Sequence, residues 1–509
     1  MSPAAHALQP CDQAHGRGGT GDHIGNLMTM VKSGGTKGIG HHTGGHPHYD
    51  GWPMWFSINH QQMHVDWLKR AVDGGMRLMV LDAVNNELFC SASPKAAGVT
   101  SCDDMAAVRL QIQQAKAIES RIDNASGGPG QGWYRIVYTA QQARDAITSG
   151  KLAVVLGVEV DKLFNCRGCT EQQVRSRLDT LYNMGVRKLT PVHLADNDFG
   201  GPALYEDLFN ANNFFLNQKF YDVIDCTDRG IGFRLGNEGP DLAKLLNALG
   251  LTNIGTPEPY PAGGHCNRTG LRPLGRFLIH EMMSKRMIID VAHMGDRTLR
   301  ATLAVTDSSD YPVVASHSAL LDVAVPAKRS ERALSNASVA AIRKNGGLIG
   351  LGIGGGGVKD VAVNTRIPND CSHSTKSFAQ EYLTAISRLN GGPVAFGSDL
   401  NGLERMTAPR FGKDACTGEP SVPQQAATMV SYPFAGHRLT TTFPAMQAGN
   451  RTFDFNTDGI AQVGMYPDLI EDLKKIGLTN EELDPLFLSA DAFVRLWEKA
   501  ENKTIASLP

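Results

Sequence analysis

The feature that most restricts the fold of this chain is a repeated alternation of short apolar runs with amphipathic helical segments. The runs are rich in Val, Ile and Leu, and short glycine-containing turns join them to the helical segments. Such alternation predicts an α/β fold with a parallel sheet. The predicted main strands lie at residues 76–84, 152–158, 187–192, 287–291, 312–316, 347–353 and 393–397.

Polar residues at the ends of these runs favour a barrel over an open sheet. A (β/α)8 barrel needs eight strands and collects its catalytic groups at the carboxyl ends of several of them. One ionisable residue at a strand end is usually an ordinary core or loop residue, but several at equivalent positions indicate a shared site. The residues at such ends here are Glu159, His193, His293, His317 and Asp399.

Two successive runs, "MIIDVAHMGD" and "PVVASHSAL", end in His293 and His317. Two neutral imidazoles together with a carboxylate such as that of Glu159 suit a borderline divalent ion such as Zn²⁺. Bound zinc lowers the pKa of its water to about 7 and so supplies hydroxide at neutral pH. We therefore interpret the two histidines as metal ligands.

Length and charge exclude several classes of protein. The 509 residues can hold two or three average domains or one barrel with insertions. The net charge of -2 gives no basic excess for nucleic acid. No apolar segment is long enough to predict a membrane span, and the N-terminus as it stands has no signal-peptide pattern.

We expect a leader at residues 1–57 that packs on a hydrolase barrel at residues 58–509, with insertions at about 195–268 and 404–455. The leader is rich in Gly and His, but its irregular spacing favours structural roles over a metal site. The nine cysteines are an odd number at low density and predict no disulfide scaffold. For Cys166 and Cys169, a local disulfide or two free thiols is expected rather than a structural zinc. The compartment stays open.

Five motifs together resemble the membrane (renal) dipeptidase family of the amidohydrolase superfamily. They occur in the family's order and at strand positions: "GVEV", "TPVHLADN", "IIDVAHMGD", "VVASHSAL" and "AFGSDLNG". The resemblance covers roughly residues 76–498. It implies a TIM-like (β/α)8 barrel that hydrolyses small dipeptide-like substrates with metal-activated water and two zinc ions, and it leaves a homodimer open.

The resemblance also implies roles for individual residues. Glu159 is similar to the carboxylate that bridges the two zinc ions, and His293 and His317 resemble the two imidazole ligands of one of them. His193 resembles the histidine that binds the scissile carbonyl oxygen and stabilises the oxyanion. Asp399 is similar to the carboxylate that moves a proton from the attacking water to the leaving amine.

The substrate carboxylate is expected to meet an arginine. Arg332, in "KRSERALSNAS", resembles the family's arginine, and a guanidinium can hold a carboxylate through two parallel hydrogen bonds. Where the family has Arg-Asn this chain has Arg-Ala, and Arg329 lies three residues away, so Arg329 remains an alternative.

The chain departs from the family at the first strand, which carries a His-x-Asp or His-x-His pair for the other zinc ion. The first predicted strand here, at residues 76–84, corresponds to the family's second. His64 and Asp66 form a His-x-Asp, but they fall in a helical stretch, where residues two apart point to different faces. Leader histidines are a further alternative: His23, His46 and His48.

An N-terminally incomplete chain is the simplest expectation for this departure. The leader would then be the loop after the absent strand, and an export signal upstream would explain why none is seen. Two other functions stay open for the same site. It could hydrolyse another small amide or a lactone, since fold and metal do not fix the substrate, or it could be a silent barrel that only binds a ligand.

Overall fold

The computed structural model describes residues 53–56, 63–92, 101–236, 259–354, 363–416 and 426–505. Almost all of the predicted leader, including His23, His46 and His48, lies outside these residues. The division into a leader and a barrel therefore stays a prediction. The helix expected ahead of the first strand begins at Val65, and His64 is its N-cap.

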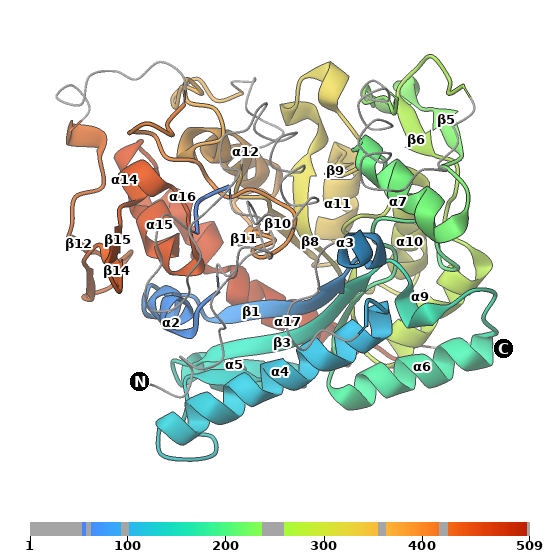
Figure 1. The fold of residues 1–509 in the computed structure, drawn as a ribbon, viewed down its shortest axis with the longest axis horizontal. Coiled ribbons are helices and arrows are strands. Elements are labelled where there is room, and N and C mark those ends of the chain that lie inside the picture. Colours follow the sequence, from blue (N-terminus) through green and yellow to red (C-terminus); the bar gives the residue numbers. More distant parts are fainter. Residues whose placement is uncertain are drawn as a thin grey trace.

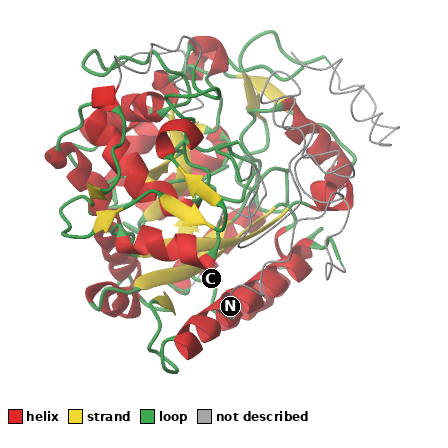
Figure 2. Cartoon of the chain, turned by 60° about the vertical axis from the view of Figure 1, so that its left-hand side comes forward, coloured by secondary structure: helices red, strands yellow, loops and turns green. Residues whose placement is uncertain are grey.

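A curled sheet of parallel strands forms the centre of the molecule (Figures 1 and 2). Seven strands follow one another in the order β1-β3-β4-β7-β8-β10-β11, and every pairing along this path is parallel. All seven predicted strands are present. Their bounds are β1 Leu78–Asn85, β3 Leu152–Val160, β4 Lys188–Thr190, β7 Ile288–Asp290, β8 Val313–Leu320, β10 Leu348–Leu351 and β11 Ala395–Phe396. Two short strands pair at the side of this path, β2 (Tyr134–Ile136) with β3 and β9 (Ala333–Leu334) with β8.

Helices cover the outer face of the sheet (Figure 2). Most strands of the path are followed by a helix that packs back on the sheet, as expected of an α/β fold. The helices with their bounds are α2 Val65–Asp73, α3 Glu87–Ala92, α4 Asp104–Ala125, α5 Ala140–Thr148, α6 Glu171–Met184, α7 Asp207–Asn217, α9 Pro273–Ser284, α10 Asp296–Asp307, α11 Asn336–Lys344, α12 Thr375–Arg388, α14 Phe455–Asp458, α15 Tyr466–Lys475, α16 Asn480–Phe487 and α17 Ser489–Glu501.

Local sequence explains why these elements form where they do. All nine residues of β3 are buried, so its run of apolar residues suits a parallel strand covered on both faces. Helix α6 begins with a capping box between Thr170 and Gln173 and ends at Gly185, whose φ of 105° is the left-handed conformation that favours glycine.

The two predicted insertions contain small two-stranded sheets that are separate from the central sheet. The first contains α7 and the antiparallel pair β5 (Val223–Asp225) and β6 (His265–Asn267). The second contains two antiparallel pairs, one of β12 (Phe434–Ala435) with β13 (Thr442–Phe443) and one of β14 (Met446–Ala448) with β15 (Arg451–Phe453).

The sheet has two ends, β1 and β11, and no pairing joins them within the described ranges. A cavity of about 1530 Å³ is lined by residues of both strands, including Leu78 and Val80 of β1 and Ala395 and Phe396 of β11. The prediction of an α/β, barrel-like fold is confirmed, and within the described residues the open edge lies between β1 and β11, the predicted first and last strands.

Cysteine pairing differs from the prediction. Eight of the nine cysteines form four disulfides, and Cys11 lies outside the described residues. Cys166 and Cys169 form a local disulfide, as one of the alternatives held. Three further pairs join residues 12, 40 and 45 positions apart, which sequence spacing did not reveal: Cys90–Cys102, Cys226–Cys266 and Cys371–Cys416. Separately, none of the described helices is long and apolar enough to cross a membrane.

Candidate active site

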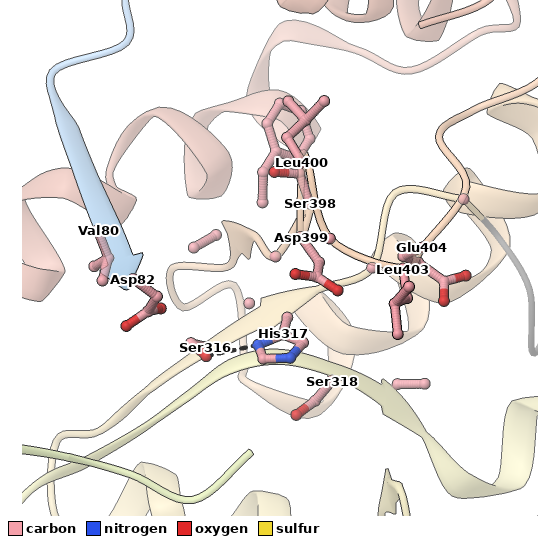
Figure 3. A pocket seen from close by; sticks show the side chains of 18 of the residues that line it. Val80, Asp82, Ser316, His317, Ser318, Ser398, Asp399, Leu400, Leu403 and Glu404 are labelled. Carbon is pink, nitrogen blue, oxygen red and sulfur yellow. Dashed lines mark hydrogen bonds between the residues drawn. The ribbon is translucent and has the colours of Figure 1, made fainter. Parts of the chain in front are cut away.

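The five residues predicted from strand ends all line the same cavity. Glu159 belongs to β3 and His317 to β8, while the other three lie three residues beyond the ends of their strands, namely His193 after β4, His293 after β7 and Asp399 after β11. Figure 3 shows the carboxylate of Asp399 facing His317 across this cavity. Because the carboxyl ends of parallel strands meet at one edge of a sheet, the fold brings these residues together.

Glu159, His293 and His317 form a tight group. Glu159 Oε1 lies 3.3 Å from His293 Nε2 and 3.6 Å from His317 Nε2, and the two Nε2 atoms lie 2.8 Å apart. Glu159 Oε1 is buried and has no hydrogen-bond partner in the structure. A buried carboxylate oxygen without a donor is costly unless something else occupies its lone pairs. Two facing imidazole nitrogens and this oxygen therefore fit a metal ion.

Electrostatics favour the metal-binding protonation state at the two histidines of this group. Burial, opposed by the positive charge of Lys188 and His193, raises the pKa of Glu159 to about 7. Burial and the nearby guanidinium of Arg332 hold the pKa of His293 and of His317 well below the usual value of 6.5. Both imidazoles are therefore neutral at pH 7, which is the form that donates a lone pair to a metal.

His193 lies against the metal group. Its ring centroid is 4.7 Å from that of His293, and the ligand atoms of Glu159, His193 and His293 all lie within 4.8 Å of one another. His193 Nδ1 lies 3.0 Å from Asp161 Oδ1, and although burial lowers the pKa of His193, Asp161 and other carboxylates raise it overall. Asp161 was missed by sequence reasoning, although it stands two residues after Glu159 on the same run.

Arg332 is the arginine of the cavity. One of its nitrogens, Nη2, lies 3.4 Å from His293 Nε2, and the other, Nη1, is buried without a hydrogen-bond partner. Arg329 instead donates to the backbone oxygens of Ala324 and Asp322. A buried guanidinium nitrogen that lacks an acceptor can accommodate a substrate carboxylate, so geometry favours Arg332 over the alternative.

Tyr205 is a cavity residue that the sequence did not indicate. Its hydroxyl lies 3.4 Å from His293 Nδ1, and the guanidinium carbon of Arg332 lies 5.9 Å from its ring centroid. Tyr205 comes from the first insertion, just ahead of α7. The insertion thus contributes a wall of the cavity, although no sequence motif marks this residue.

Two of the five strand-end residues have backbone angles that L-residues adopt rarely. His293 has a φ of 65° and Asp399 a φ of 48°. Left-handed backbone is tolerated best by Asn, Asp and His among non-glycine residues, yet it still stores conformational strain. Such positions cluster at functional sites, where the surrounding structure holds a side chain in a required direction.

His64 and Asp66 do not join this group. His64 Nδ1 accepts a hydrogen bond from the backbone N–H of Asp66 and so caps α2, while the Asp66 side chain is 61% exposed. Neither residue lines the cavity with the metal group. The expectation that this His-x-Asp does not form a strand-type ligand pair agrees with its place at a helix start.

A charged layer that the sequence did not reveal lies beside the metal group. Lys188, fully buried at the start of β4, has its Nζ 2.8 Å from Asp82 Oδ2 and 2.5 Å from Asp290 Oδ2. Gly157 of β3 makes room for it, because a Cβ there would stand 2.0 Å from Asp82 Oδ1 and 2.9 Å from Lys188 Cδ. The charges cross from β1 through β4 to β7.

Comparison with known proteins supports the resemblance. Residues 258–408 match the sequence model of the membrane dipeptidases, Peptidase family M19. No curated protein matches the chain. An amidohydrolase from Pseudomonas aeruginosa is similar at 15% identity and a TM-score of 0.46, over 86% of this chain and 92% of that one.

A metallo peptidase from Rhodobacter sphaeroides, liganded with a phosphinate mimic of the dipeptide L-Ala-D-Ala, is similar at 16% identity and a TM-score of 0.47, over 85% of this chain and 89% of that one. Such low similarity assigns no function. The matched range contains His293, His317, Arg332 and Asp399. Over residues 258–408 the chain is therefore related to the membrane dipeptidases of peptidase family M19, a family of hydrolases.

Proposed function

We propose that this protein is a zinc-dependent hydrolase of small dipeptide-like substrates. The observation that supports it most is the buried, unpartnered Glu159 Oε1, which faces the Nε2 atoms of two neutral histidines. Together with the family match at residues 258–408, this group favours metal-assisted hydrolysis.

Glu159, His293 and His317 would hold the ion, each through a side chain from a different strand or strand end. Nitrogen and carboxylate ligands of this kind suit zinc. Zinc bound there would supply a water whose pKa is lowered to about 7 and would polarise the substrate carbonyl. The buried setting strengthens every charge interaction in the cavity, because the effective dielectric constant is low there.

The remaining residues position and protonate the substrate. Arg332 would bind the free carboxylate of the peptide through its unpartnered Nη1. His193, whose Nδ1 lies 3.0 Å from Asp161 Oδ1, would hydrogen-bond the carbonyl oxygen where negative charge develops. Asp399, which faces His317 across the cavity, would accept a proton from the attacking water and return it to the leaving amine (Figure 3).

The test uses the full chain loaded with zinc and a panel of dipeptides, N-acyl amino acids and lactones, each measured as kcat/KM. Dipeptides are expected to have the highest kcat/KM of the three classes. Asp399→Asn is expected to lower kcat/KM by about 100-fold or more, because general acid–base transfer is removed. Asp66→Asn, at an exposed side chain outside the cavity, is the control and should leave kcat/KM unchanged.

Each other outcome of this panel contradicts part of the proposal. Preference for N-acyl amino acids or lactones would keep the hydrolase and overturn the dipeptide assignment. Absence of metal-dependent turnover on every class, from protein that binds zinc, would overturn the enzymatic function and favour a barrel that only binds a ligand.

A further inference from the structure

A chain of contacts runs from the buried lysine to the far side of the His317 ring. Lys188 Nζ meets Asp290 Oδ2, which accepts a hydrogen bond from Ser316 Oγ at 2.5 Å. Ser316 Oγ lies in turn 2.8 Å from His317 Nδ1 (Figure 3), and the other ring nitrogen, Nε2, is the one near Glu159. The contacts link β4, β7 and β8, which are neighbours in the sheet.

The donors around Asp290 determine which way the Ser316 hydroxyl points. Asp290 Oδ1 accepts from the backbone N–H groups of Ala292 and Ser316, at 3.0 and 3.1 Å. Asp290 Oδ2 meets Lys188 Nζ and the hydroxyls of Thr190 and Ser316. Donors surround both oxygens, so the Asp290 carboxylate acts as an acceptor. The Ser316 hydroxyl must therefore donate its hydrogen bond to Asp290.

A serine hydroxyl has only one proton, so the contact between Ser316 and His317 has a fixed direction. With that proton committed to Asp290, Ser316 Oγ can act only as an acceptor toward His317. The proton of the neutral imidazole must then sit on Nδ1 and donate to Ser316. It follows that His317 Nε2 carries a free lone pair, directed at the group formed with Glu159 and His293.

We propose that Ser316, oriented by Asp290 and Lys188, is a positioning residue that fixes His317 in its Nδ1-protonated form and aims Nε2 at the metal group. The metal half of this statement rests on the proposed function, whereas the tautomer does not. A partner on the second ring nitrogen orients a ligating histidine, and its loss typically costs about 10- to 100-fold in metal affinity.

His293 lacks an equivalent arrangement on its own second nitrogen. Among the described residues its Nδ1 meets only the Tyr205 hydroxyl, at 3.4 Å, a distance at which a hydrogen bond is weak. A phenol can either donate or accept, so this contact does not fix the proton. The two histidines of the group are therefore expected to differ, because Ser316 fixes the tautomer of His317 from Nδ1, whereas the Tyr205 contact does not fix that of His293.

The test reads the tautomer directly in metal-free protein. Long-range proton–nitrogen NMR correlations of ¹⁵N-histidine-labelled protein distinguish Nδ1–H from Nε2–H rings, and His317→Gln identifies the signals of His317. The wild-type ring is expected to show the Nδ1–H pattern alone. A wild-type ring with the Nε2–H pattern would overturn the proposal without any variant being needed.

Variants then locate the cause. Ser316→Ala should give a mixture of tautomers at His317 and weaken zinc binding, measured by competition with a chelator, by about 10- to 100-fold. Ser316→Thr retains the hydroxyl and should restore both readouts. The matched control is Ser318→Ala on the same strand, whose hydroxyl lies outside this chain of contacts and should change neither readout.

The outcomes separate this proposal from the proposed function. An unchanged Nδ1–H pattern in Ser316→Ala, with zinc affinity within about twofold of wild type, would overturn the role of Ser316. Failure of the dipeptide panel would leave the tautomer result standing, because it is measured without metal or substrate. A tautomer change without any loss of zinc affinity would overturn the metal half alone.

Discussion

The two sides of the cavity are built differently. On the side formed by β3, β4, β7 and β8, each strand pairs with the next, and the strands carry Glu159, His193, His293 and His317 above a buried charged layer. On the other side, β1 and β11 face the cavity and do not pair with each other in the described part of the chain.

Side chains take over part of the bonding on the second side. The carboxamide of Gln111 bonds both the N–H and the C=O of Val84, near the end of β1, as a neighbouring strand would. Asp82 Oδ1, also on β1, is buried without a hydrogen-bond partner. Neighbouring parallel strands thus bring four ionisable side chains together, whereas β1 at the open edge adds Asp82 to the charged layer and relies on the Gln111 side chain for part of its backbone bonding.

The largest effect is expected from a substitution at the centre of the paired side, Glu159→Gln. Glu159→Gln should abolish metal-dependent turnover, because the ligating carboxylate itself is lost. Removal of a ligand's hydrogen-bond partner typically lowers metal affinity by about 10- to 100-fold, and the loss of affinity in Glu159→Gln should be larger. Elemental analysis and chelator competition measure this. The control is Glu498→Gln, at a half-buried carboxylate that pairs with Arg144 away from the cavity.

The metal count of the wild-type protein sharpens the same comparison. One tightly bound zinc ion per chain is expected, because the paired side supplies three clustered ligands and β1 and β11 supply no comparable group among the described residues. A second ion of equal affinity would show that the two sides are equivalent.

Lys188→Met tests the charged layer beneath the paired side. Removing this fully buried amine leaves Asp82 and Asp290 uncompensated, and breaking a buried pair in this way typically costs about 3–5 kcal/mol in the free energy of unfolding. Urea unfolding measures it. Lys344→Met is the matched control, because its pair with Asp307 is exposed and is expected to contribute about 0–1 kcal/mol. Equal losses of unfolding free energy in the two variants would contradict the expected difference between a buried and an exposed ion pair.

Glu331 tests how the first insertion is held on the paired side. Its carboxylate accepts backbone N–H groups of Leu204, Asn267 and Asp296, which favour the charged form, yet burial is the larger effect and raises its pKa to about 8. The folded protein therefore retains a proton that the unfolded chain loses above its ordinary pKa of 4.5. Stability from this group is full below pH 4.5 and is lost as the pH rises through about 8.

Thermal unfolding of wild type and Glu331→Gln at pH 5 and pH 9 checks this. The drop in Tm between the two pH values should be smaller in the variant, although the variant is less stable overall because Gln is a poorer acceptor. An identical drop in both proteins would contradict the assignment to Glu331.

The smallest expected effect is at the open edge. Gln111→Ala removes two part-buried hydrogen bonds to Val84, each with a net contribution of about 0.5–1.5 kcal/mol, and water can replace some of it at an unpaired edge. Hydrogen exchange at the Val84 amide should accelerate while amides of β3 stay protected. Equal acceleration in β3 would show that β1 and β3 open together and that the edge is not a separate region.

The sequence predicted the α/β class, all seven main strands and the five strand-end residues that the structure places in one cavity. It could do so because burial on both faces of a parallel sheet requires continuous apolar runs, and because strand ends gather at one edge. Their roles in catalysis stay predictions. It did not reveal Tyr205, which comes from an insertion without regular pattern, nor the three longer disulfides.

What the sequence by itself determined is therefore local: which runs become strands, where each one ends and which ionisable residue follows. The tertiary structure alone decided that Ser316 joins Asp290 to His317, that Gly157 leaves room for Lys188, and that β1 and β11 become the open sides of one cavity. These contacts depend on packing between strands distant in the chain. Spacing along one sequence does not encode which buried charges meet, because that depends on how the sheet curls.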